Sequence, residues 1–202
     1  MPSQRTSSPG DDKLLIATRE SVVRHGVRRT TANDIAERAG VSRMTFYRRM
    51  GSVENAVLAT LTREFRTVAA DVRSSSPTGT GRDELVHFAI HCVRVFATSE
   101  LLDSIAERDP EFLIPYVTDR FGASQQLILD EFQGLITAGL ADESIRATPA
   151  TATTLLLALQ GVALSARLLR KTGAFEESLV ELETMITRHL TPSAAPTAGV
   201  ES

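Results

Sequence analysis

Residues 42–49 bring together side chains that can contact a nucleic acid. The stretch reads S-R-M-T-F-Y-R-R and holds three arginines around Thr45 and Tyr47. An arginine fork can bind a phosphate or a guanine at two points, and hydroxyl groups can bind phosphate oxygens. If Phe46 faces a core, its neighbours stay near the surface. The chemistry that this pattern favours is DNA binding.

Two short helices joined by a tight turn would position those side chains. Thr31, followed by Asp34, resembles a capping arrangement that begins one helix, and Ser42 can cap a second helix over 43–49. Gly40 between them can take the left-handed conformation that ends the first helix tightly. A short helix, a glycine turn and a second short helix form a helix-turn-helix.

The apolar residues of this segment are expected to face inward. Ala36 and Ala39 are small enough to let the two helices approach closely, and Val41 and Phe46 can pack between them. We interpret Ile35, Phe46 and Met50 as core residues only. The residues left near the surface are then Arg43, Met44, Thr45, Tyr47 and Arg48.

This segment resembles the N-terminal domain of the tetracycline-repressor (TetR) family. The resemblance rests on the run T-x-x-D-I-A-x-x-A-G-V-S over 31–42, the T-F-Y triplet after it, and Ser52 opening another helix. It implies a DNA-binding domain joined to a larger helical domain. Met44, Met50 and Val53 stand where the family often has a glycine, an aromatic residue and a lysine, which leaves the operator sequence open.

The resemblance also implies roles for individual residues. Thr31 and Tyr47 would contact phosphates and fix the register, and Arg43 and Thr45 would approach base edges. Met44 would offer an apolar surface to a thymine methyl group. Arginines 48 and 49 would contact phosphates, with a surface salt bridge as a nearly equal alternative for the second. The predicted DNA-binding residues are Thr31, Ser42, Arg43, Met44, Thr45, Tyr47, Arg48 and Arg49.

The rest of the chain shows helical spacing and no alternating strand pattern, so the predicted fold class is all-α. Ser, Pro and Gly content predicts a disordered arm at 1–10, a linker at 74–81 and a disordered tail at 191–202. We expect a three-helix DNA-binding domain over 11–51 and a helical ligand-binding and dimerisation domain over 52–190. Further helices are expected near 11–26, 53–74, 82–98, 101–108, 111–139 (interrupted at Pro115 and Gly122), 148–170 and 175–189.

Charge is distributed unevenly along the chain. Residues 1–66 carry 12 Lys+Arg against 7 Asp+Glu, whereas 67–202 carry 10 against 18. Phosphate attraction is screened within about 10 Å at moderate salt, so only the basic end is expected to contact a polyanion.

The single cysteine, Cys92, excludes an internal disulfide and fits a reducing cytoplasm. Residues 1–12 are polar and include no apolar run long enough for a secretory signal, so none is expected.

One helix-turn-helix reads few base pairs, so we expect a homodimer on a pseudo-palindromic operator with half-sites ~34–36 Å, or a multiple, apart. Residues 147–166 carry no charge over 20 positions, a length that could span a bilayer. Their Thr, Ala, Gln and Gly content favours a buried interface helix and no membrane. The predicted interface residues are Leu155, Ala158, Gly161, Ser165, Leu179, Leu182 and Ile186. For the last three, burial within one protomer is the safer interpretation.

The resemblance implies a small-molecule pocket among the middle helices, whose occupant moves the DNA-binding domains apart. The side chains there suggest an apolar or aromatic effector, although for each residue taken singly plain core packing is the favoured role. The candidates are Phe65, Phe88, Cys92, Phe96, Leu102, Ile105, Tyr116, Phe121, Leu127 and Ile128.

Other chemistry has little support in the sequence. His87 and His91 have metal-ligand spacing on a helix, but no second cluster accompanies them, so we expect a solvated face and no metal. Nucleophile–base pairs and phosphate-binding loops are missing, which argues against an enzyme and a cofactor. The leading hypothesis is a ligand-responsive transcriptional regulator, most often a repressor. The alternative is an effector-independent architectural or division-related DNA-binding protein.

Overall fold

A computed structural model describes residues 9–75 and 79–192 of the chain. Within them every regular element is a helix, which confirms the all-α fold class. Most of the predicted arm and tail, and residues 76–78 of the predicted linker, lie outside the described residues. The elements are α1 (Pro9–His25), α2 (Ala32–Arg38), α3 (Arg43–Met50), α4 (Val53–Ser75), α5 (Gly81–Ala97), α6 (Glu100–Arg108), the short 3₁₀ helix η1 (Pro110–Phe112), α7 (Pro115–Thr118), α8 (Ala123–Ala141), α9 (Thr151–Lys171) and α10 (Phe175–Leu190).

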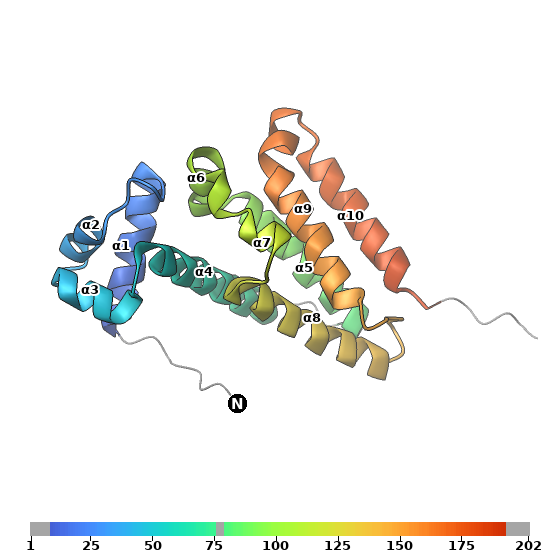
Figure 1. Cartoon of the computed structure of the whole chain (residues 1–202). Helices are drawn as coiled ribbons and strands as arrows, with labels where there is room; N and C mark the ends of the chain where they lie inside the picture. The colour runs from blue at the N-terminus through green and yellow to red at the C-terminus, as the bar shows by residue number, and fades with distance from the viewer. Residues whose placement is uncertain (1–8, 76–78, 193–202) are drawn as a thin grey trace, which may run out of the picture.

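The first three helices form a small unit at one end of the molecule (Figure 1). α2 packs on both α1 and α3. Leu14, Ile35 and Phe46, one from each helix, are fully buried in a common core. The small residues Ala36 and Ala39 are buried there too, as the sequence predicted, and they allow the helices to lie close together. α4 then runs from this unit into the rest of the molecule (Figure 1).

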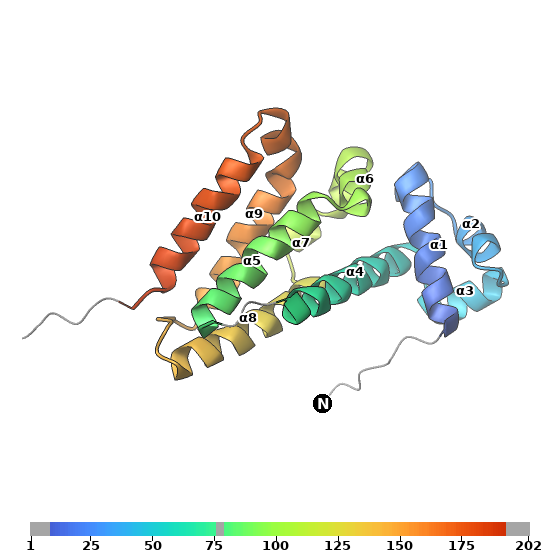
Figure 2. The ribbon, with the colours of Figure 1, turned by 180° about the vertical axis from the view of Figure 1, so that it is seen from behind.

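α5 lies at the centre of the larger part, in contact with α4, α8, α9 and α10 (Figure 2). Phe88 of α5 and Phe132 of α8 meet edge to face with ring centroids 5.7 Å apart. The two predicted interruptions are confirmed, since α7 begins at Pro115 and α8 begins after Gly122. Proline suits the first turn of a helix because the amide it lacks has no partner there.

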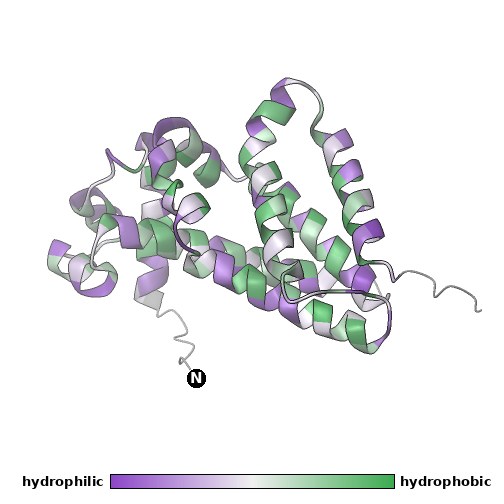
Figure 3. Ribbon diagram, turned by 45° about the vertical axis from the view of Figure 1, so that its right-hand side comes forward, coloured by the Kyte–Doolittle hydropathy of each residue, from purple (hydrophilic) through white to green (hydrophobic). Residues whose placement is uncertain are grey.

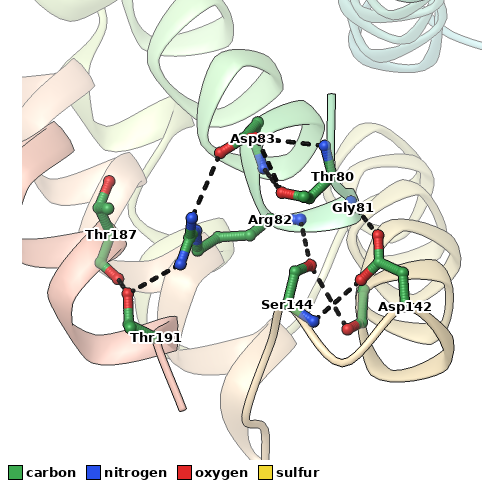
Figure 4. A network of polar contacts seen from close by, with 9 residues as sticks. Thr80, Gly81, Arg82, Asp83, Asp142, Ser144, Thr187 and Thr191 are labelled. Carbon is green, nitrogen blue, oxygen red and sulfur yellow. Dashed lines mark hydrogen bonds and ion pairs between the residues drawn. The ribbon is translucent and has the colours of Figure 1, made fainter. Parts of the chain in front are cut away.

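A polar corner fixes the start of α5 against the end of α8 (Figure 4). The Gly81 N–H donates to Asp142 Oδ2 at 2.7 Å, and the Arg82 N–H donates to Ser144 Oγ at 3.0 Å. These bonds satisfy amides that the first turn of a helix leaves without partners. A Cβ on Gly81 would overlap the backbone of Gly139, so the two helices approach closely here. The corner holds the helices that surround the cavity described below.

Candidate nucleic-acid interface and effector cavity

The turn between α2 and α3 has the predicted geometry. Thr31 Oγ1 accepts the Asp34 N–H at 3.2 Å, and Ser42 Oγ accepts the Thr45 N–H at 3.1 Å, so both predicted N-caps are confirmed. Gly40 has a φ of 67°, in the left-handed region. A Cβ at this position would meet nothing within 4 Å, so glycine is needed for backbone conformation and not for space.

α3 presents a polar face to solvent, as the sequence predicted. Met44 is 77% exposed and Tyr47 40% exposed, whereas Phe46 is fully buried. The Arg43 guanidinium carbon lies 5.4 Å from the centroid of the Tyr47 ring. Within the described part of the chain, Arg43 and Arg48 form no ion pair, so both cations are available to a polyanion.

Arg49 differs from the other arginines of α3. Its Nη1 lies 3.2 Å from Asp11 Oδ1, so it joins α3 to the first turn of α1. This is the salt bridge that the sequence left as the alternative to a phosphate contact. To contact a DNA phosphate, the Arg49 guanidinium would have to bind the phosphate and the Asp11 carboxylate together, or leave the carboxylate for the phosphate.

A cavity of about 460 Å³ lies among helices α4 to α9. Small-molecule sites have volumes of roughly 300–1,000 Å³, so the space is large enough for a ligand. Phe65 of α4 and Phe96 of α5 stack on its wall with ring centroids 3.7 Å apart. Seven of the predicted effector-binding residues line it, namely Phe65, Cys92, Phe96, Leu102, Tyr116, Phe121 and Ile128.

The other three predicted effector-binding residues do not line the cavity. Phe88 faces the core against Phe132, and Leu127 packs at the margin of the same core. Ile105 is fully buried with Val22 of α1 in a separate apolar cluster. A helix surrounded by neighbours has more than one buried face, so apolar spacing alone could not separate core residues from cavity residues.

The polar part of the lining was not predicted from the sequence. Gln125 Nε2 donates to the Tyr116 carbonyl at 2.8 Å and to Gln160 Oε1 at 2.6 Å. Gln160 Nε2 donates to the same carbonyl at 3.3 Å. The one available signal was Gln160 itself, a polar residue inside the uncharged stretch 147–166. The charged lining residues are Asp103, Arg120 and Arg167.

Cys92 lines the cavity but is a poor nucleophile there. Burial raises the pKa of its thiol to about 12, and the nearby Glu131 carboxylate adds to the shift. The thiolate is the reactive form of cysteine, so at neutral pH the side chain behaves as a small apolar group.

His87 and His91 do not lie on the solvated face that the sequence predicted. Both are half-buried, with ring centroids 5.8 Å apart, and the Nε2 atom of His87 is buried with no hydrogen-bond partner among the described residues. The expectation was wrong because α5 has neighbours on most of its circumference. Across residues 9–75 and 79–192, no group of three side chains is arranged to hold a metal ion.

α6 connects the cavity to the helix-turn-helix unit. Leu102, Asp103 and Ala106 line the cavity, whereas Leu101 and Ile105 pack against α1 and α4 on the other side. At the end of the helix, the buried Asp109 carboxylate accepts the Val27 N–H at 2.6 Å, in the turn that follows α1. Ser104 Oγ donates to the Val22 carbonyl at 2.9 Å. α6 therefore contacts both the cavity and α1.

The predicted dimer residues fall into two groups. Ala158, Gly161 and Ser165 are exposed on α9, together with Leu157, Leu164 and Leu168, which the prediction omitted. Leu155, Leu179, Leu182 and Ile186 are instead buried in the core of the protomer, so they leave little surface for a second copy to contact. For Leu155 this is a correction, because the uncharged stretch does not show which side of α9 packs inward.

By length and composition alone α9 could cross a membrane, and 28% of its most apolar stretch is buried. Apolar residues recur along it from one end to the other (Figure 3). Exposed positions 154, 157, 161, 164 and 168 alternate in steps of three and four residues. That spacing is typical of a helix that packs against another helix.

A solvent-facing helix-turn-helix attached to a helical domain that encloses a cavity is the architecture of a ligand-binding transcriptional regulator. The family of bacterial regulatory proteins of the tetR type matches residues 14–54. An uncharacterized HTH-type transcriptional regulator of Mycobacterium bovis is 32% identical over 168 residues, covering 82% of this chain and 85% of the relative. The chain belongs to the TetR family of transcriptional regulators.

Solved structures share the fold. The TetR-family repressor QsdR of R. erythropolis matches with a TM-score of 0.65 and 16% identity, covering 92% of this chain and 97% of the other. FadR of Bacillus subtilis in complex with stearoyl-CoA matches with a TM-score of 0.58 and 14% identity, covering 91% and 99%. At such identities the likeness shows a common fold. The family is one of transcriptional regulators and not of enzymes.

Proposed function

We propose that the protein is a repressor that binds a pseudo-palindromic operator as a homodimer and leaves it when a small apolar or aromatic effector enters the cavity. The observation that carries this proposal is the position of α6, which lines the cavity on one side and packs on α1 on the other. We assign DNA binding to residues 11–51 and effector binding and dimerisation to 52–190. The site of action is the cytoplasm, where the operator DNA lies.

The exposed face of α3 supplies the DNA contacts in this proposal. Arg43 and Thr45 approach base edges from the start of the helix, while Tyr47 and Arg48 contact phosphates. Thr31 and Ser42 each sit just before a helix, where free backbone amides favour a phosphate oxygen. Met44, the most exposed of the large apolar side chains in the described residues, would meet a thymine methyl group.

The homodimer would form through the outward face of α9 together with α10. Leu157 and Leu168 leave apolar surface exposed on α9, and Gly161 between them allows a close approach of helices. On α10, Val180 and Met185 are more than half exposed. Burying these residues against a second copy would stabilise the dimer by roughly 25 cal/mol for each Å² of apolar area removed from water.

Effector binding would act by shifting a population of conformations. A ligand that needs α6 displaced binds better to the form in which α6 no longer holds α1 in the DNA-binding arrangement. Operator affinity then falls by the ratio of the ligand's affinities for these two forms of the protein. FadR of Bacillus subtilis, which shares the fold, was solved with stearoyl-CoA, so this architecture can hold a ligand with a long apolar chain.

The test is a footprint of the purified protein on the DNA flanking its own gene, across a salt series. A protected pseudo-palindrome, with affinity falling steeply as salt rises, is the expected result. A library of small apolar molecules is then screened for release of that DNA. Specific DNA binding that no cavity-filling molecule alters would support an effector-independent architectural protein and refute the ligand-responsive half of the proposal.

A further inference from the structure

The charges that line the cavity do not balance. Asp103 accepts two hydrogen bonds from Arg170 Nη2, both at 3.0 Å, so its negative charge is paired. Arg167 donates to Glu107 Oε1 at 2.8 Å, so its positive charge is paired as well. Arg120 forms no ion pair with any carboxylate in residues 9–75 and 79–192. The lining therefore carries one uncompensated positive charge.

Arg120 is held beside the cavity mouth. Its guanidinium carbon lies 5.5 Å from the centroid of the Tyr116 ring, which places the cation over an aromatic face. The backbone carbonyl of Tyr116 is fixed in turn by the side-chain amides of Gln125 and Gln160. Gln125 is itself buried and also accepts the Gly122 N–H at 2.8 Å. The hydrogen-bonded backbone of Tyr116 therefore holds in place the ring on which Arg120 stacks.

The surroundings of Arg120 are apolar. Val117 and Phe121 line the cavity on either side of it in the chain, and both remain about half exposed. Deeper in, the wall is formed by Phe65, Phe96 and Ile128. A ligand that fits this shape has an apolar body inside and a polar group at the rim. An anion at the rim gains attraction from Arg120 while staying in contact with water.

We propose that the effector is an amphipathic monoanion, an apolar body ending in a single carboxylate-like group, and that Arg120 selects it at the mouth of the cavity. The inference rests on the proposed function, since it takes the cavity as the effector site. Beyond that function, it specifies the charge of the effector and the residue that recognises this charge.

The experiment compares three probes with the same alkyl chain, namely decanoate, decanol and decyltrimethylammonium, each below its micellar concentration. Calorimetric titration of the full chain should give an affinity order of anion, then alcohol, then cation. Because Arg120 is exposed, its preference for the anion is expected to be about two- to fivefold and to shrink as salt is added. Ala163→Phe, which narrows the cavity, should weaken all three probes and so report binding inside it.

Two arginine variants separate the proposal from a general charge effect. Arg120→Gln should erase the difference between decanoate and decanol and leave decanol affinity within about twofold, a change well under 1 kcal/mol. Arg167→Gln is the matched control, because Arg167 lines the same cavity but is already paired, and it should keep most of the preference. If both variants lose the preference for decanoate over decanol to the same extent, the assignment to Arg120 is overturned.

Failure of the inference and failure of the proposed function give different results. Equal binding of all three probes, unchanged by Arg120→Gln, would overturn the anion preference and leave the cavity as an effector site. No binding of any probe, with the folded protein verified by circular dichroism, would overturn both.

Discussion

The contact between Asp109 and the turn after α1 should be a main support of the DNA-binding arrangement. The Asp109 side chain is only 5% exposed, and it accepts the Val27 N–H at 2.6 Å and the Arg28 N–H at 3.3 Å. It also pairs with Arg28 Nε at 3.3 Å. Asp109→Ala would leave a buried amide without a partner, so we expect it to lower the free energy of unfolding by about 2–4 kcal/mol.

Glu111 provides a matched control because it pairs with the same arginine. Its side chain is 49% exposed, in contrast to that of Asp109. Exposed ion pairs contribute about 0–1 kcal/mol, so Glu111→Ala should have little effect on stability. In thermal unfolding, Asp109→Ala should lower the Tm by roughly 4–16 °C and Glu111→Ala by only a few degrees.

The same pair of variants tests the coupling role of α6. Loss of the Asp109 carboxylate should let the three-helix unit sample other orientations, and operator affinity should fall by the fraction of molecules that leave the competent one. Operator titration at a temperature where both variants are folded measures this effect. If Asp109→Ala costs no more stability and no more affinity than Glu111→Ala, the reasoning about this contact is wrong.

Four further outcomes are expected. Arg43→Ala should cost ~1–3 kcal/mol at one base position and relax sequence preference there, whereas Tyr47→Phe should weaken binding to all sequences alike, as titration of an operator library would show. Cys92, with a thiol pKa of about 12, should resist alkylation at neutral pH until denaturant unfolds the chain, and mass spectrometry would detect early labelling if this is wrong. Hydrogen bonds from the Gly81 amide and from Ser144 lower the pKa of Asp142 in the folded state. The ionised Asp142 carboxylate should therefore stabilise the fold at neutral pH, and this stabilisation should be lost as pH falls through the lowered pKa. Asp142→Asn should accordingly flatten the acid limb of a curve of Tm against pH. Leu157→Glu should shift the mass in solution from dimer to monomer without loss of helicity, and an unchanged dimer would contradict the assigned interface.

The helix-turn-helix could be predicted from sequence because its determinants are local. The caps at Thr31 and Ser42 act on amides three residues ahead, and the left-handed turn at Gly40 depends on that residue's own backbone. The inward position of Phe46 follows from the helical repeat. Interactions within three or four residues leave a direct trace in the order of amino acids.

The cavity could be predicted only in part, because its walls come from distant segments. Leu102 and Ile105 lie on one short amphipathic helix, yet one lines the cavity and the other packs on α1. The polar lining was missed because Gln125 and Gln160 become neighbours only when α8 and α9 pack together. Neither the pairing of Arg167 nor the lack of an ion pair at Arg120 can be read from positions in the chain.

The sequence by itself determined the all-α class, the helix-turn-helix with its exposed arginines, and the positions of most helix ends. Those features depend on the helical repeat and on capping side chains, which act within a few residues. The tertiary structure decided which apolar face of each helix is core, which lines the cavity and which is left on the outside of α9. An apolar side chain packs against whatever neighbour the fold brings to it, because the hydrophobic effect has no direction of its own.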